Sequence, residues 1–139
     1  MTQRILFICT HNSARSQMAE GLLRHLGGRA FDVYSAGTEA TIVRPFAIQV
    51  MAELDINISR QSSKILDRYL HERFDDVITV CDTAAEACPI FPNATHMRHW
   101  SFEDPSKAIG SQEEQLAVYR RVRDEIRARI EQELLNTNN

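Results

Sequence analysis

The sequence predicts an α/β fold in which a four-stranded parallel sheet is flanked by helices, a three-layer open sandwich. Three observations support this prediction. Short strand-like segments alternate with helical segments, the arrangement that gives parallel strands joined by crossover helices. The first of these segments is apolar throughout Ile5–Cys9, as expected of a strand buried on both faces. The chain has 139 residues, of which 43% are hydrophobic and 25% charged, so we expect one domain spanning residues 1–139.

Four short segments are predicted strands. They are residues 4–9 (RILFIC), 31–35 (FDVYS), 76–81 (DVITVC) and 95–100 (THMRHW). Polar or turn-forming residues bound them, as is typical of strands in α/β proteins. Because the carboxyl ends of parallel strands meet at one edge of the sheet, we expect the segments after Cys9, Cys81 and Trp100 to share that edge.

Four further segments are predicted helices. They are residues 17–26, 45–54, 67–72 and 111–135. The first carries apolar side chains on one side and stops at Gly27, and the second has Pro45 in its first turn. The last begins at Ser111 with a capping-box pattern, and its apolar residues recur every three or four positions.

Composition and charge exclude several classes of protein. The net charge is −3, and the C-terminal arginines alternate with glutamates, so no nucleic-acid-binding surface is expected. No apolar run approaches the ~18–20 residues of a membrane span, and the run Ile5–Cys9 is too short for a signal-peptide core. Three cysteines, an odd number, argue against a secreted disulfide framework. We therefore expect a cytoplasmic protein with reduced thiols, and a monomer by default.

The segment between the first strand and the first helix predicts an oxyanion site with a cysteine nucleophile. It reads Cys9-Thr10-His11-Asn12-Ser13-Ala14-Arg15-Ser16. The backbone N–H groups of residues 10–15 can encircle an anion at the helix N-terminus, where the helix dipole adds positive charge. Arg15 supplies a bidentate fork, and Ser16 supplies a hydroxyl for the Cys9 thiolate. The lysine and paired glycines of a nucleotide-binding P-loop are absent.

Two further cysteines have a spacing that fits neither a redox C-x2-C motif nor paired zinc knuckles. Cys81 ends the third predicted strand, and Cys88 follows in a loop with two prolines. A metal or other cofactor is not expected, because no second cysteine pair accompanies them. Taken alone, the two cysteines would be interpreted as small apolar side chains that fill space in the core. Beside a reactive Cys9 they become candidates for thiol–disulfide exchange, which requires thiols that can reach one another.

Asp104 follows the fourth predicted strand and precedes Pro105. From that edge of the sheet its carboxyl group can reach the oxyanion site and, when protonated, donate to a leaving oxygen as a general acid. The alternative is that Asp104 only caps a turn.

These residues make the chain resemble the low-molecular-weight tyrosine phosphatase superfamily and, within it, the thioredoxin-coupled arsenate reductases. The similar stretches are ILFICTHNSARSQMAEGLL, VYSAGTEA, VITVCDTAAEACPIFP, HWSFEDP and YRRVRDEIRARIE. The Cys-x5-Arg-Ser loop indicates the superfamily and its phosphatase-like fold. Cys81, Cys88 and the segment around Asp104 indicate the reductase branch.

The resemblance implies a relay of thiols. Cys9 attacks arsenate held by the loop and Arg15, while Asp104 protonates the departing hydroxide. Cys81 then attacks Cys9 and arsenite leaves. Cys88 next attacks Cys81, and thioredoxin reduces the Cys81–Cys88 disulfide. Phosphate and sulfate should compete with arsenate, and segment 82–88 should move to bring Cys88 to Cys81.

Some relatives bind a potassium ion with residues that match Asn12, Glu20 and Ser35 and with an acidic residue. Lys64 occupies the acidic position here, so its ammonium can replace the ion, and no potassium dependence is expected. His11 replaces a glycine common in the loop, and it either tunes Cys9 or is merely solvated.

Two other functions stay open. A hydrolytic phosphatase would use Cys9, Arg15 and Asp104 without Cys81 or Cys88. A sensor of trivalent arsenic would use the three thiols as ligands.

Overall fold

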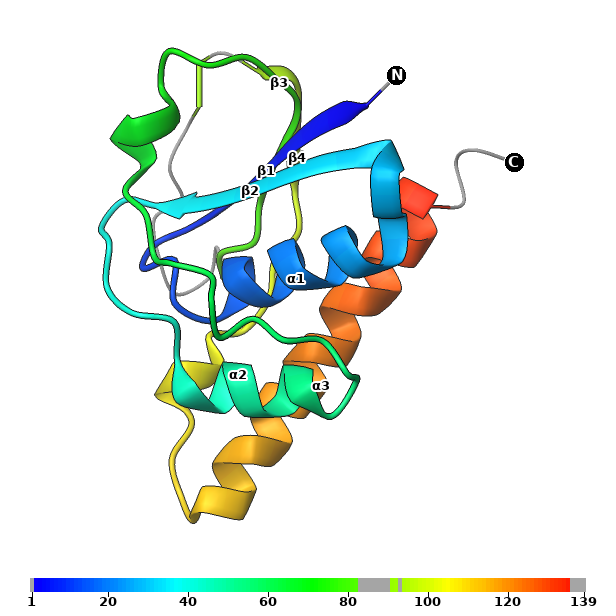
Figure 1. Cartoon of the computed structure of the whole chain (residues 1–139). Helices are drawn as coiled ribbons and strands as arrows, with labels where there is room; N and C mark the ends of the chain where they lie inside the picture. Colours follow the sequence, from blue (N-terminus) through cyan, green and yellow to red (C-terminus); the bar gives the residue numbers. More distant parts are fainter. Residues whose placement is uncertain (1, 83–90, 93, 136–139) are drawn as a thin grey trace.

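The computed structural model of the chain describes residues 2–82, 91–92 and 94–135. These residues form a four-stranded sheet of order β2-β1-β3-β4 (Figure 1). All neighbouring strands run parallel. The strands are β1 (Gln3–Cys9), β2 (Phe31–Gly37), β3 (Phe74–Thr79) and β4 (Ala94–His99). The predicted α/β fold with a four-stranded parallel sheet is thus confirmed.

Three α-helices are present among the described residues. They are α1 (Arg15–Gly27), α2 (Pro45–Ala52) and α3 (Gln112–Ile130). Shorter turns are the 3₁₀ segments η1 (Gly28–Ala30), η2 (Leu66–Tyr69) and η3 (Pro105–Lys107) and the π-helical η4 (Glu131–Leu135), which continues α3. The capping box predicted at Ser111 is formed: its hydroxyl accepts from Glu114 N at 3.1 Å, and Ser111 N donates to the Glu114 carboxylate at 3.0 Å.

The side chains of β1 alternate between two apolar clusters, one on each face of the sheet. Ile5, Phe7 and Cys9 pack with residues of α1, α2 and α3. Leu6 and Ile8 pack on the other face with η2 and Phe91. Figure 1 accordingly shows the α-helices on one side of the sheet and η2 on the other. Because β1 is buried on both faces, its carboxyl end is held rigidly where Cys9 begins the predicted anion-binding loop.

Several element boundaries differ from the prediction. β3 ends at Thr79 rather than at residue 81, so Cys81 lies two residues beyond the strand. The first helix begins at Arg15 rather than at residue 17, which places Arg15 and Ser16 in its first turn. The short helix expected at 67–72 is the 3₁₀ turn η2. The sequence gives no signal for these differences, because the hydrogen-bond partners of a strand end are distant in the sequence: Val80 N, just beyond β3, still donates to Ile8 O at 2.8 Å.

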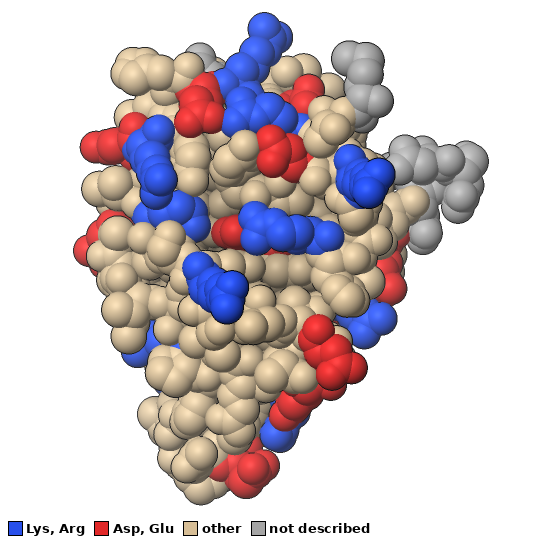
Figure 2. Space-filling model, in the orientation of Figure 1, with Lys and Arg blue, Asp and Glu red and all other residues tan. Residues whose placement is uncertain are grey.

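The face shown in Figure 2 carries basic and acidic side chains next to one another, without a large area of one sign. Among the described residues, no helix combines the length and apolar character needed to cross a bilayer.

Candidate functional site

The loop between β1 and α1 is held in shape by hydrogen bonds to its carbonyl oxygens. Thr10 O, His11 O and Ser13 O all accept from side chains or amides outside the loop. The donors are Glu39 N (3.1 Å) and Thr38 Oγ1 (3.1 Å) to Thr10, Thr41 Oγ1 (3.0 Å) and Ser63 Oγ (3.2 Å) to His11, and Arg44 N (2.9 Å) to Ser13. With its carbonyls turned outward, the loop can present its N–H groups to an anion at the N-terminus of α1.

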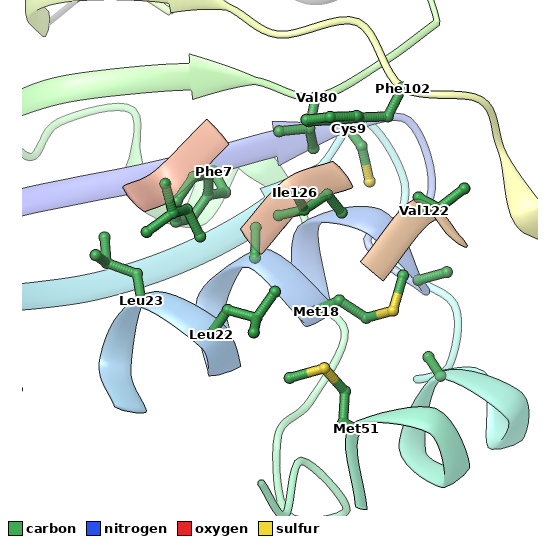
Figure 3. Packing of buried hydrophobic residues seen from close by; sticks show 14 of the residues in the cluster. Phe7, Cys9, Met18, Leu22, Leu23, Met51, Val80, Phe102, Val122 and Ile126 are labelled. Atoms are coloured by element: carbon green, nitrogen blue, oxygen red, sulfur yellow. The ribbon is translucent and has the colours of Figure 1, made fainter. Parts of the chain in front are cut away.

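Cys9 lies at the base of this loop and is almost fully buried, with 2% of its surface exposed. It belongs to the same apolar cluster as Val80, Phe102 and Val122 (Figure 3). Two polar groups reach its sulfur: Asn12 N donates to Sγ at 3.2 Å, and Ser16 Oγ lies 2.9 Å from it. The thiolate, which is the nucleophilic form of cysteine, can accept hydrogen bonds from both groups.

Asn12 joins the loop to its surroundings. Its φ of 47° is in the left-handed region, which asparagine tolerates better than most residues. Its side-chain nitrogen donates to Ser16 Oγ at 2.8 Å and to Ser35 Oγ at 3.0 Å. Its side-chain oxygen accepts from Gln17 Nε2 at 2.9 Å and from Lys64 N at 2.7 Å. These four bonds fix the turn that brings Asn12 N to the Cys9 sulfur.

Arg15 and Asp104 meet at the site although they are far apart in the sequence. Arg15 is 2% exposed; its guanidinium donates to Phe102 O at 3.2 Å and lies 3.5 Å from Asp104 Oδ2. The other carboxylate oxygen of Asp104 accepts from Ser106 N at 3.0 Å and from Ser106 Oγ at 2.7 Å. Asp104 therefore caps η3, as one interpretation of the sequence had it, while its second oxygen faces Arg15; its role as a general acid stays a prediction.

Cys81 is a fully buried thiol near the carboxyl end of β1. Its sulfur lies 3.9 Å from Ile8 O, the carbonyl next to Cys9 in the chain. Cys9 and Cys81 are both thiols in this structure. Cys88 and nearly all of segment 82–88 lie outside the described residues, so the Cys81–Cys88 pairing and the movement of this segment stay predictions.

His11 bonds to an acidic neighbour. Its Nδ1 lies 2.5 Å from Glu39 Oε1, and about a third of its side chain is exposed. Residues 39–41 also hold the backbone of the loop beside His11. Glu39 N donates to Thr10 O, and Thr41 Oγ1 donates to His11 O. His11 is thus only partly exposed to solvent. The two groups described at the Cys9 sulfur belong to Asn12 and Ser16, not to His11.

Lys64 lies with the three residues that the resemblance placed at a cation site. Its side chain is 10% exposed, and its ammonium lies 3.6 Å from the Glu20 carboxylate. Ser35 Oγ donates to the same Glu20 oxygen at 2.5 Å, and Asn12 bonds to Ser35. Burial lowers the pKa of Lys64, while the negative charge of Glu20 opposes that shift.

Sequence reasoning missed the contribution of Gly37 and of the segment 38–44. A Cβ on Gly37 would lie 2.7 Å from Thr10 O, 2.8 Å from Asn12 N and 3.0 Å from Cys9 O. All three atoms are backbone of the anion-binding loop, so they cannot turn aside as a flexible side chain would. The signals in the sequence are the position of Gly37 just after the predicted strand 31–35 and its place in the family-like stretch VYSAGTEA.

We expect Gly37→Ala to lower phosphate affinity by at least about tenfold, because the added methyl displaces the loop that must bind the anion. Isothermal titration of phosphate measures this. Gly28→Ala is the matched control: Gly28 has a φ of 56°, but a Cβ there has no neighbour within 4 Å. That control should lose about 1 kcal/mol of stability and keep its phosphate affinity. Equal affinities for Gly37→Ala and wild type would contradict the role given to Gly37.

Comparisons with known proteins agree with this geometry. The sequence profile of the low-molecular-weight phosphotyrosine protein phosphatase family matches residues 4–138. An arsenate reductase of Halalkalibacterium halodurans is 51% identical over 126 residues, 91% of each chain. A solved arsenate reductase in its phosphate-binding state superimposes with a TM-score of 0.81 at 34% identity, covering 94% of this chain and 95% of the other.

A second solved structure is the thioredoxin-dependent arsenate reductase of Corynebacterium glutamicum, with a TM-score of 0.66 at 29% identity. The match covers 97% of this chain and 63% of that one.

Proposed function

Because the chain belongs to the low-molecular-weight phosphotyrosine protein phosphatase family, and within it to the arsenate reductase branch, we propose that it reduces arsenate to arsenite. One observation carries the proposal beyond the family: a second buried thiol, Cys81, lies beside the carbonyl that precedes the nucleophile Cys9. A hydrolytic phosphatase has no use for that thiol, whereas a reduction needs a source of two electrons.

In the first step the Cys9 thiolate attacks the arsenic atom of arsenate bound in the loop. A sulfur–arsenic bond forms, and an arsenic–oxygen bond breaks. Arg15 and the loop N–H groups stabilise the charge on the oxyanion. Asp104, which lies 3.5 Å from Arg15, protonates the departing oxygen so that it leaves as water. The product is a thioarsenate adduct on Cys9.

In the second step the Cys81 thiolate attacks the sulfur of Cys9. The sulfur–arsenic bond breaks and its electron pair stays on arsenic, which is thereby reduced from the +5 to the +3 state. Arsenite leaves, and a Cys9–Cys81 disulfide remains. This transfer requires the two sulfurs to come within bonding distance, with their Cα atoms less than about 7 Å apart.

In the third step the Cys88 thiolate attacks Cys81, which frees the Cys9 thiolate and leaves a Cys81–Cys88 disulfide. Since Cys81 is fully buried, the segment that follows it must move before a reductant can reach this bond. Thioredoxin is the proposed reductant, in keeping with the thioredoxin-dependent neighbour from C. glutamicum. Such a cycle fits a single-domain, monomeric protein in the cytoplasm, where thiols are kept reduced.

The proposal predicts that both Cys81→Ser and Cys88→Ser abolish steady-state arsenate reduction. Without Cys81 the adduct is not resolved, and without Cys88 the Cys9–Cys81 disulfide accumulates after one turnover. Arsenate-dependent NADPH oxidation with thioredoxin and thioredoxin reductase measures the rate. Glutaredoxin with glutathione in place of thioredoxin tests the alternative reductant. Turnover of Cys88→Ser at the wild-type rate would overturn the relay.

A second candidate, hydrolysis of phosphoesters, is favoured by the same Cys9, Arg15 and Asp104. The residues after Asp104-Pro105 are Ser106 and Lys107 rather than the aromatic residues expected of an enzyme for aryl phosphates. We therefore expect only weak hydrolysis of aryl phosphates, unaffected by Cys88→Ser. Hydrolysis of aryl phosphate without any arsenate-dependent turnover would favour the phosphatase.

A further inference from the structure

A continuous chain of polar contacts runs from Lys64 to the nucleophile. The Lys64 ammonium lies 3.6 Å from Glu20 Oε1, to which the Ser35 hydroxyl donates at 2.5 Å. Asn12 Nδ2 joins Ser35 Oγ to Ser16 Oγ, and Ser16 Oγ lies 2.9 Å from the Cys9 sulfur. Glu20, Ser35, Asn12 and Ser16 are each at most 5% exposed, so this part of the chain is buried.

The contacts of Asn12 and Glu20 assign the donors and acceptors of this chain as far as Ser16. Lys64 N is an amide and can only donate, so the Asn12 atom that it contacts at 2.7 Å is the side-chain oxygen. The Asn12 side-chain nitrogen therefore donates to both Ser35 and Ser16. An ionised Glu20 can only accept, so the Ser35 hydrogen points to Glu20.

The last bond in the chain has one direction when Cys9 is a thiolate. A thiolate can only accept, so Ser16 Oγ, which accepts from Asn12, donates its own hydrogen to the Cys9 sulfur. The direction depends on Glu20 being ionised. A protonated Glu20 could donate to Ser35, whose hydrogen would then compete with Asn12 and loosen the whole chain.

Two cations lie against the buried Glu20 carboxylate. Arg24, whose side chain is half exposed, donates to Oε2 at 2.8 Å. Lys64 is the buried partner of Oε1, the oxygen that accepts from Ser35. Its ammonium also donates to Ser62 O at 2.5 Å, which fixes it in place. Removing a buried partner leaves the carboxylate poorly compensated, which weakens the arrangement that it anchors.

From this arrangement we infer that Lys64 is a positioning residue for Cys9: through Glu20, Ser35 and Asn12 it keeps the Ser16 hydroxyl directed at the nucleophile. The inference deepens the proposed function, because the first attack on arsenate needs the Cys9 thiolate. It concerns only the state of that thiol, however, so it can be tested without arsenate.

Lys64 and Glu20 also line a cleft of about 620 Å³ between α1, β2 and residues 55–64. Figure 2 shows charged side chains on this face of the protein. Because the cleft is open to solvent, a small cation can reach the space that a shorter side chain at position 64 would leave. The contact therefore lends itself to chemical rescue.

The test measures the pH dependence of Cys9 alkylation by iodoacetamide. The protein carries Cys81→Ser and Cys88→Ser, so Cys9 is the only thiol that reacts. Adding Lys64→Met removes the ammonium and keeps the backbone N–H that bonds to Asn12. We expect the midpoint of the alkylation profile to rise by about one pH unit and the rate at neutral pH to fall roughly tenfold.

Three controls make the result specific. Arg60→Met removes an exposed cation from the same cleft and should leave the profile unchanged. Ser35→Ala breaks the chain at its middle and should raise the midpoint similarly, with no further rise when combined with Lys64→Met. Lys64→Ala should regain much of the alkylation rate in ammonium or potassium chloride but not in choline chloride, whose cation is too large.

An unchanged midpoint in folded Lys64→Met would overturn the role of Lys64. If that variant does not fold, Ser35→Ala decides, and its unchanged midpoint would overturn the chain itself. A raised midpoint, found together with a wild-type protein that fails to reduce arsenate in the thioredoxin-coupled assay, would support the positioning role and refute the proposed function, so the two failures can be told apart.

Discussion

Cys9→Ser is expected to abolish arsenate reduction, with a loss of at least about 10⁴-fold in turnover. A serine hydroxyl is a far weaker nucleophile than a thiolate, and serine cannot form the Cys9–Cys81 disulfide that releases arsenite. The surrounding contacts are kept, because Asn12 N and Ser16 Oγ can still bond to an oxygen in place of the sulfur. Phosphate affinity should therefore stay within a few-fold of wild type.

The thioredoxin-coupled assay measures the first effect, and isothermal titration of phosphate measures the second. Retained phosphate binding shows that the loop is intact and that only the chemistry is lost. Residual turnover of Cys9→Ser above one tenth of the wild-type rate would mean that another thiol attacks arsenate first.

Arg15→Lys is expected to lower kcat/KM for arsenate by about 10² to 10³-fold. Arg15 is buried and uses its planar fork to contact Phe102 O and to approach Asp104 Oδ2. A lysine ammonium keeps the charge but cannot make both contacts and also receive two oxygens of a tetrahedral anion. The loss should appear both in phosphate affinity and in kcat, since the charge on the oxyanion grows in the transition state.

Arg120→Lys is the matched control for Arg15→Lys, because Arg120 is a partly exposed arginine of α3 that pairs with Glu53. Its substitution should leave phosphate affinity and turnover unchanged. A wild-type kcat/KM for Arg15→Lys would show that charge alone, without the fork, suffices at this position.

The parts of the fold that depend on local pattern could be predicted from the sequence. The apolar run before Cys9 predicts a strand buried on both faces, and β1 is such a strand. Ser111 and Glu114 predict a capped helix, and both bonds of the capping box are present. The segment from Thr10 to Ala14 is a loop between a strand and a helix, as predicted, whereas Arg15 and Ser16 belong to the first turn of α1.

The parts that depend on contacts between distant residues could not be predicted from pattern alone. The hydrogen bonds that turn Thr10 O and His11 O outward come from residues about 30 and 50 positions further along the chain. The need for glycine at position 37 arises because three backbone atoms of the loop lie against it. The direction of the bonds from Lys64 to Cys9 depends on which atom of Asn12 faces an amide. No local periodicity encodes such three-dimensional neighbours.

The central claim, that this chain reduces arsenate with its own thiols, is tested most directly by a single turnover without any external reductant. Fully reduced protein is mixed with a stoichiometric amount of arsenate, and arsenite, free thiols and disulfide connectivity are measured. We predict one arsenite formed and two thiols lost per chain, with the disulfide mapped by mass spectrometry between Cys81 and Cys88. Unchanged thiols with no arsenite, or arsenite formed without loss of these two thiols, would contradict it.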